Sequence, residues 1–309
     1  MKGRGGEQPV VGEATFRSYY GQPILNRPVW AAPDIPGYLF LGGLAGASSV
    51  VAAAAAASGR RSLARASKLS STAAIGLSGA ALVHDLGRPA RFYNMLRVFK
   101  PTSPMSVGSW LLAGFAPMSA AASVAALTGR FRLAGAAGTV GAAALGPLVA
   151  TYTAALVSDT AVPAWHEGHR EMPFVFAASA LASAAGMGLA AAPHSETAPL
   201  RVLGAAAGAA ELGLIEAMKR GMPDVKGAFE AGRARRYEWG ARVGTAAGVV
   251  AAVTLGRRGR FGAALSGACL LAGSALTRFA VFEAGIASAE DPRYTVVPQR
   301  RRLSEGART

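Results

Sequence analysis

Long apolar stretches recur along this chain, and each has the length of a helix that crosses a lipid bilayer. The eight stretches are roughly 35–57, 63–84, 107–127, 133–157, 173–192, 199–218, 238–255 and 261–282. A bilayer core of about 30 Å needs roughly 20 helical residues, and inside lipid the backbone must satisfy its own hydrogen bonds. We therefore predict an all-α integral membrane protein of about eight transmembrane helices, arranged as two four-helix bundles.

The residues outside these stretches divide the chain into three parts. Residues 1–34 form a polar segment, 35–285 the transmembrane domain, and 286–309 a basic tail. Within the apolar stretches, glycines recur four residues apart, at Gly42/Gly46, Gly204/Gly208 and Gly244/Gly248. Such spacing lets helix backbones approach closely in lipid. Each pair marks either a close helix contact or a chance spacing in a chain rich in glycine and alanine.

The charge of the chain is placed as in a membrane protein. The formal net charge is +15, but arginines cluster between the apolar stretches, and seven of them lie in the short turns near residues 59–61, 129–132 and 256–260. Short basic turns mark the cytoplasmic face. This distribution argues against nucleic-acid binding. It predicts a multi-pass protein of the cell (cytoplasmic) membrane with both termini on the non-cytoplasmic side.

Metal-binding residues are scarce. The chain has 1 cysteine and 4 histidines, so a Cys-ligated iron–sulfur cluster, which needs about four thiolates, is excluded. His166 and His169 are three residues apart, whereas the helical zinc motif places its histidines four apart. Only His84 lies at the end of a predicted helix, with no second histidine inside a span to share a haem. We predict no metal site, no haem and no cluster in this chain.

The most distinctive connection joins the second and third apolar stretches. It reads HDLGRP from His84, RFYNML from Arg91 and KPTSPMSVGSW from Lys100 to Trp110. Gly87 and Pro89 end the preceding helix. The connection also carries a strip of four cationic residues, Arg88, Arg91, Arg97 and Lys100. The strip is either part of a solvated loop or a surface on which a partner docks, and the sequence favours docking.

This connection resembles the NrfD-like family, the membrane subunits of polysulfide-reductase-type complexes. The resemblance extends to PGYLFLGGLAG at 36–46 and YTAALVSDTAVPAW at 152–165. It implies a haem-free, quinone-reactive anchor of a respiratory oxidoreductase complex, with menaquinone or ubiquinone as exchangeable substrate. It also implies two partners: a four-cluster ferredoxin-like iron–sulfur subunit and a molybdopterin catalytic subunit. Tyr152 matches the quinone-contacting tyrosine of the family, and Tyr38 is a candidate for the contact from the first helix, where the chain has no histidine.

The residues themselves suit such a site. Quinol oxidation releases two protons, so the site needs hydrogen-bond partners for both ring oxygens and a route for protons. His84 and Asp85 end one helix, and Tyr152 and Asp159 lie seven residues apart near the end of another, at the same face. Trp110 and Trp165 supply flat apolar walls at the same level. We predict that the quinone head group binds near Tyr152, His84, Asp85 and Tyr38, with Asp159 as a second proton carrier.

Four further charges lie within or beside the apolar stretches: Glu211, Glu216, Arg278 and Glu283. Charges at this depth are costly and are usually paired or functional. They indicate either a buried ion pair between Arg278 and a glutamate of the sixth helix or a proton path through Glu211. The alternatives to a quinone-reactive anchor are therefore a secondary transporter or proton-translocating module, and a purely structural anchor.

Overall fold

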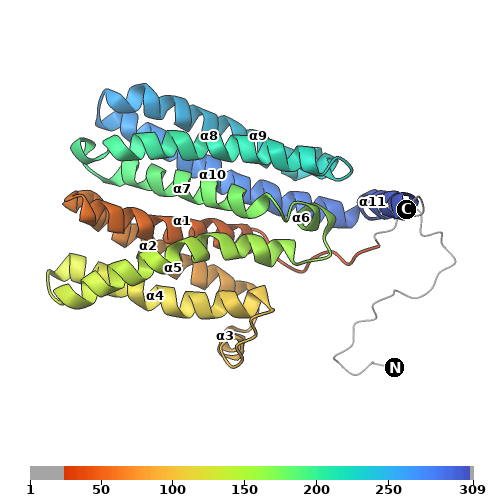
Figure 1. The fold of residues 1–309 in the computed structure, drawn as a ribbon, viewed down its shortest axis with the longest axis horizontal. Coiled ribbons are helices and arrows are strands. Elements are labelled where there is room, and N and C mark those ends of the chain that lie inside the picture. The colour runs from red at the N-terminus through yellow and green to blue at the C-terminus, as the bar shows by residue number, and fades with distance from the viewer. Residues whose placement is uncertain (1–23, 307–309) are drawn as a thin grey trace.

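The computed structural model describes residues 24–306. All regular secondary structure in this part of the chain is helical. Eight helices have 20 residues or more and run side by side along the long axis of the molecule (Figure 1). They are α1 (Asp34–Ala57), α2 (Arg61–Asp85), α4 (Pro104–Thr128), α5 (Arg132–Ser158), α7 (Met172–Ala191), α8 (Ala198–Gly221), α9 (Gly232–Val253) and α10 (Arg260–Glu290). Each of the eight predicted stretches is thus a helix. The all-α membrane fold is confirmed.

The long helices pack as two bundles of four. Helices α1, α2, α4 and α5 form the first bundle, and α7, α8, α9 and α10 form the second. The bundles meet along α1 and α7, with α5 and α10 completing the contact. Short helices lie in the connections: α3 (Phe92–Met95), α6 (Pro163–Glu167) and α11 (Arg293–Gly306).

Glycines allow the first and last helices of each bundle to touch backbone to backbone. A Cβ added to Gly46 of α1 would lie 2.3 Å from the carbonyl oxygen of Gly146 in α5. In the second bundle, a Cβ on Gly267 of α10 would lie 2.4 Å from the carbonyl oxygen of Gly186 in α7. Such contacts replace hydrophobic association, which lipid does not supply. Of the six glycines in the pairs spaced four residues apart, four lie so close to a neighbour that an added Cβ would be less than 3.0 Å away: Gly46, Gly204, Gly208 and Gly248. At Gly244 and Gly42 the nearest atom would be 3.2 Å and 3.5 Å away.

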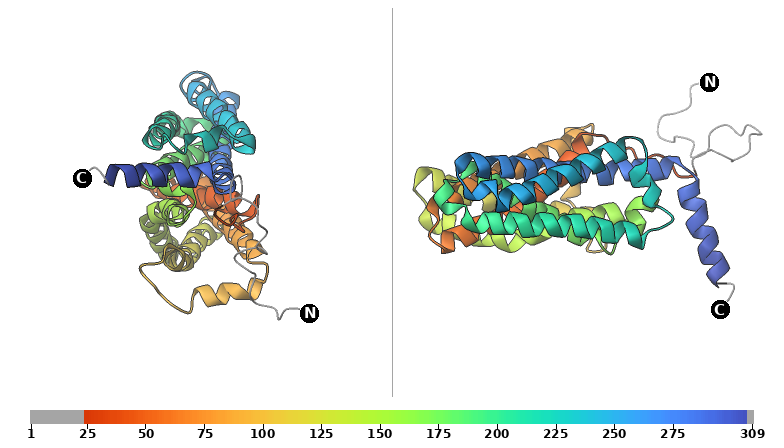
Figure 2. Two further views of the ribbon diagram at one scale, coloured as in Figure 1. Left: turned by 90° about the vertical axis from the view of Figure 1, so that its right-hand side faces the viewer. Right: turned by 90° about the horizontal axis from the view of Figure 1, so that it is seen from above.

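Both described ends of the chain lie at one end of the molecule, together with α3, α6 and α11, and we call this the terminal end (Figures 1 and 2). The turns between α1 and α2, α4 and α5, α7 and α8, and α9 and α10 lie at the opposite end. The predicted basic turns therefore share one end. Helix α11 projects steeply from the bundle at the terminal end (Figure 2).

Six of the eight long helices are apolar and long enough to cross a membrane by composition; α2 and α9 are not among them. Helix α2 is hydroxyl-rich, and its hydroxyls bond inside the first bundle: the Ser71 hydroxyl donates to the Ala45 carbonyl at 2.9 Å, and Thr72 bonds Ser123 of α4 at 2.7 Å. Satisfied hydroxyls carry little penalty inside a bundle. Helix α9 is charged only in its first half, at the terminal end.

Candidate functional site

A cavity of about 90 Å³ opens in the first bundle at the terminal end. This volume is several times what one water molecule needs. Its walls are mainly aliphatic side chains and methionines from α1, α2, α4 and α5, with few polar groups; the lining comprises Trp30, Ile35, Tyr38, Leu39, Leu82, Asp85, Leu86, Met95, Met105, Ser109, Leu112, Tyr152, Leu156 and Val157. An apolar cavity with a few convergent polar groups is the usual form of a small-molecule site.

Two tyrosines supply most of the polar character of this cavity. The hydroxyls of Tyr38 on α1 and Tyr152 on α5 are hydrogen-bonded to each other although 114 residues separate them. Tyr152 fits because α4 has no side chain at Gly108, where an added Cβ would lie 2.3 Å from Cε2 of the Tyr152 ring. The paired hydroxyls can both donate to and accept from an oxygen of a bound molecule.

Asp85 and His84, at the end of α2, hold the chain segment 30–34 across the cavity. The Asp85 carboxylate accepts a hydrogen bond from the backbone N–H of Ala31 at 3.1 Å. The His84 ring bonds the Asp34 carboxylate at 2.8 Å, and its side chain is 80% exposed. Asp85 therefore lines the cavity, whereas His84 stands at its rim. Both fix the position of Trp30.

Trp30 forms a flat wall of the cavity and joins it to the second bundle. Its ring stacks on Trp165 of α6 with centroids 5.4 Å apart. Trp165 donates from Nε1 to the Val281 carbonyl of α10 at 2.8 Å and sits where a Cβ on Gly285 would be 1.9 Å from its ring. The stacked rings therefore connect the cavity wall at Trp30 with α10.

Two predicted site residues lie away from this cavity. Trp110 packs edge-on against Phe99, with centroids 6.3 Å apart, and is 43% exposed. Asp159 is exposed beyond the last turn of α5, where its backbone N–H bonds the Ala155 carbonyl at 2.9 Å. Sequence reasoning missed Trp30, Ser109 and Asp34 as members of the site. A tryptophan shortly before the first helix was the available signal for Trp30.

The four cations of the α2–α4 connection lie on the surface at this same end. All four side chains are exposed, and within residues 24–301 none has a carboxylate partner; they are Arg88, Arg91, Arg97 and Lys100. Tyr93, Val98 and Phe99 are exposed beside them. Cations without partners next to exposed apolar groups form a surface suited to an acidic protein.

Glu211 and Arg278 form a second polar site, buried inside the second bundle. Glu211 of α8 is 0% exposed and Arg278 of α10 is 1% exposed. Among the described residues no ion pair within 4 Å joins them, and neither carboxylate oxygen makes a hydrogen bond of ordinary geometry, although the hydroxyls of Ser179 and Thr277 lie close to the carboxylate. Arg278 instead donates to the Phe176 carbonyl at 2.8 Å and lies over that ring. Buried polar groups without partners are rare.

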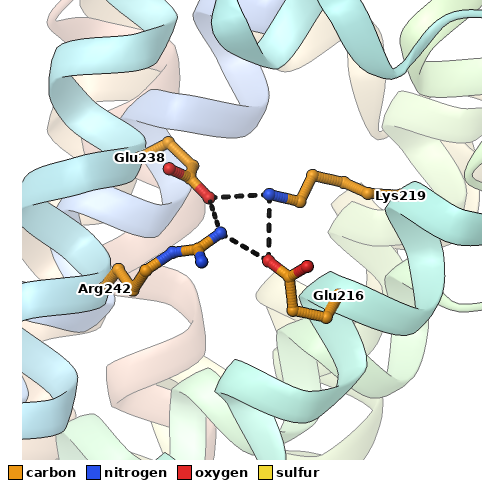
Figure 3. A network of polar contacts seen from close by, with 4 residues as sticks. All are labelled: Glu216, Lys219, Glu238 and Arg242. Carbon is orange, nitrogen blue, oxygen red and sulfur yellow. Dashed lines mark hydrogen bonds and ion pairs between the residues drawn. The ribbon is translucent and has the colours of Figure 1, made fainter.

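The other two predicted acids lie apart from this pair and are ion-paired. Glu216 of α8 belongs to a closed network with Lys219, Glu238 and Arg242, which joins α8 to α9 (Figure 3). In it, Lys219 Nζ lies 3.0 Å from Glu216 and 2.8 Å from Glu238. Glu283 pairs with Arg233 at 3.5 Å. Of the four charged residues predicted within or beside the apolar stretches, Glu211 and Arg278 are the two that the described part of the structure places in the same buried region.

A cavity of about 120 Å³ extends from this network into the second bundle. Glu216 and Arg242 line its outer part, and Thr277, the neighbour of Arg278 in the chain, lines it between α8 and α10.

Over the described residues, no group of three or more His, Cys, Asp or Glu side chains gathers as a metal site would require. His169 bonds the backbone carbonyl of His166 at 2.8 Å.

The family model described as polysulphide reductase, NrfD, matches residues 24–195. This range is more than half of the 309 residues of the chain and includes every residue that lines the tyrosine cavity. It ends before α8. No curated protein matches the chain.

Proposed function

The chain belongs to the NrfD polysulphide reductase family, whose members are membrane subunits of polysulfide-reductase-like complexes, and from this premise we propose that the tyrosine cavity is a quinone site. One observation carries the proposal: an apolar cavity at the terminal end of the first bundle holds the facing hydroxyls of Tyr38 and Tyr152. A quinone ring is flat and apolar and has two oxygens that need hydrogen bonds. Trp30 offers a surface for the ring, and the tyrosines offer bonds to one oxygen.

The residues around the cavity supply what quinol oxidation needs besides electron transfer. Oxidation breaks two O–H bonds and releases two electrons and two protons, and reduction of a quinone reverses this. A proton leaving the ring at the tyrosines reaches Asp85, which lines the cavity, and then the His84–Asp34 pair at the rim. Asp159, exposed at the same end, is the proposed second carrier.

The electrons then pass to a partner. We propose a four-cluster ferredoxin-like iron–sulfur subunit that docks at the terminal end on Arg88, Arg91, Arg97 and Lys100, with a molybdopterin subunit behind it. The support is the position of these exposed cations at the end of the molecule that holds the cavity. In this scheme the chain contributes the quinone site and carries no haem or cluster of its own.

The proposed orientation places the terminal end outside the cytoplasm in the cell membrane. Its support is the gathering of the short basic turns at the opposite end, which favours a cytoplasmic position for that end. A reporter enzyme fused to the C-terminus reads the side directly, and a cytoplasmic signal would contradict this orientation.

Gly108→Ala tests the quinone site without removing any group that contacts quinone. The added Cβ would lie 2.3 Å from the Tyr152 ring, so the ring must move and its hydroxyl leaves the cavity. We expect quinone-linked turnover of the complex to fall roughly tenfold or more, since displacement of a reacting partner by about 1 Å is costly, while dye-linked turnover of the catalytic partner is unchanged.

The matched control lies on the same helix. A Cβ on Gly114 meets only Leu145 at 3.5 Å, an ordinary contact, so Gly114→Ala should leave both activities intact. Equal quinone kinetics in the two variants would remove the tyrosine cavity from the reaction and leave the chain a structural anchor.

A second function, proton translocation through the second bundle, is favoured by the carboxyl group of Glu211, which is fully buried and makes no ion pair within 4 Å among the described residues. Burying a carboxyl group costs free energy, so an acidic residue inside a membrane bundle usually has a function. We propose that protons reach it through the cavity that begins at Glu216 and Arg242. The family match ends before α8, so the support for this function is geometric alone.

Glu211→Gln keeps the shape of the side chain and removes its ability to carry a proton. We expect proton uptake per turnover in proteoliposomes to fall while the complex assembles in normal amount and quinone turnover without a membrane potential continues. Loss of the assembled complex in this variant would instead assign Glu211 a structural role beside Arg278, and unchanged proton uptake would exclude the path.

A further inference from the structure

A groove without an assigned role lies on the outer surface of the second bundle, along the first turns of α9. Its volume is about 830 Å³, and its lining includes Glu230, Arg235, Arg236 and Trp239. It continues into a smaller hollow of about 300 Å³, which shares three of these side chains and reaches Lys219 and Arg242 of the ion network. The groove lies at the terminal end, beyond the range of the family match.

The two arginines of the groove have no carboxylate partner in the described part of the chain. Their neighbours are already occupied: Arg233 pairs with Glu283, and Arg242 bonds Glu216 and Glu238 (Figure 3). Glu230 is the one carboxylate that lines the larger hollow among the described residues. With Arg235 and Arg236 exposed beside it, the groove has a net positive charge that favours an anion.

The exposed face of α9 shows what kind of anion this is. From the terminal end inward, its exposed residues without an ion pair in the described part of the structure include Arg235 and Arg236, then Trp239, which is 66% exposed, then Val243 and Val250. These positions follow the helical repeat and form one stripe. Arg233 and Arg242 are also exposed on this helix, but both are held by carboxylates. The order along the stripe is cationic, aromatic and aliphatic, which matches the headgroup, interface and acyl-chain levels of one leaflet. A free phosphate would not contact the exposed side chains of Val243 and Val250, and a polar protein surface would gain little from covering them.

We propose that this groove binds a glycerophospholipid. Arg235 and Arg236 hold the phosphodiester by charge-assisted hydrogen bonds, Trp239 lies at the glycerol level, and an acyl chain follows Val243 and Val250. Guanidinium groups suit phosphate oxygens because they offer paired donors, and basic pockets beside membrane helices bind acidic headgroups. Because Glu230 faces the same hollow, it accepts hydrogen bonds from a headgroup that carries donors, such as glycerol.

Native mass spectrometry of the detergent-solubilised complex, titrated with dioleoyl-phosphatidylglycerol, tests this site. We compare the wild type with Arg235→Gln/Arg236→Gln and with the control Arg257→Gln/Arg258→Gln, an exposed pair at the opposite end of α9. We expect one fewer retained lipid and roughly tenfold weaker binding in the first variant only. The variant Arg235→Lys/Arg236→Lys, which preserves the charge, should bind at an intermediate level.

Several results would overturn the assignment. Equal lipid retention in the wild type and the Arg235→Gln/Arg236→Gln variant would do so, as would an equal loss in the Arg257/Arg258 control. Displacement of the lipid by inorganic phosphate at the same concentration would make the groove a general anion site. Dissociation of a protein partner from the Arg235→Gln/Arg236→Gln variant, with all lipid retained, would make it a protein interface.

Discussion

The double variant Tyr38→Phe/Tyr152→Phe should lose quinone-linked turnover by roughly 30- to 150-fold while dye-linked turnover of the catalytic partner is unchanged. The two hydroxyls face each other in the cavity, and phenylalanine removes them without changing the ring. Each hydrogen bond to the reacting oxygen contributes about 1 to 1.5 kcal/mol, so the two lost together are worth about 2 to 3 kcal/mol, and each 1.36 kcal/mol of barrier is about tenfold in rate. The measurement is steady-state turnover with a short-chain quinol or quinone, depending on the direction of the complex.

The single variants should each lose part of this rate, and their effects should not add because the hydroxyls share one hydrogen bond. Tyr237→Phe is the matched control, since Tyr237 lies on α9 at the same end and does not line the cavity. A parallel fall in dye-linked turnover would show that the double variant damages the complex as a whole. Unchanged quinone kinetics would remove both tyrosines from the site.

Gly46→Ala should prevent stable packing of the first bundle. The new Cβ would lie 2.3 Å from the Gly146 carbonyl oxygen and 3.0 Å from the Ala150 backbone nitrogen. Both atoms belong to the α5 backbone, so no side chain can move aside, and α1 and α5 must separate along their contact. Overpacking of this kind costs typically 1 to 3 kcal/mol. We expect a lower melting temperature and a reduced yield of monodisperse protein in detergent.

Gly37→Ala provides the comparison on the same helix. A Cβ at Gly37 meets nothing within 4 Å, and alanine favours helix over glycine by about 0.5 to 1 kcal/mol. Gly37→Ala should therefore leave the melting temperature unchanged or raise it. Similar melting temperatures for the two variants would mean that α1 and α5 do not touch through Gly46.

The positions of the long helices could be predicted from the sequence because every segment that crosses a bilayer must be apolar and must satisfy its own backbone hydrogen bonds. Apolar length predicts a helix in a bilayer, and small residues such as Gly46 predict its contacts. The basic turns predicted which helix ends lie together. Even α2, the least apolar stretch, was predicted correctly, because Ser71 and Thr72 find partners inside the bundle.

The site was predicted only in part, because its geometry depends on segments far apart in the chain. Tyr38 and Tyr152 were both expected there, but nothing local shows that their hydroxyls meet. Trp30 was missed because it lies outside any helical pattern, in a segment placed by bonds from the end of α2.

The charged residues illustrate the same limit. Glu211 and Glu216 are five residues apart, which on a helix turns them to different faces. One faces the core beside Arg278 and the other the network with α9. The sequence placed both on one helix, and only the packing of α9 and α10 separates their roles.

The most direct test of the quinone site is photolabelling of the solubilised complex with an azidoquinone, followed by peptide mass spectrometry. Binding in the tyrosine cavity predicts adducts on the α1 segment around Tyr38 and the α5 segment around Tyr152, both suppressed by excess unlabelled quinone. Competed labelling confined to α8, α9 and α10 would place the quinone in the second bundle and contradict the account.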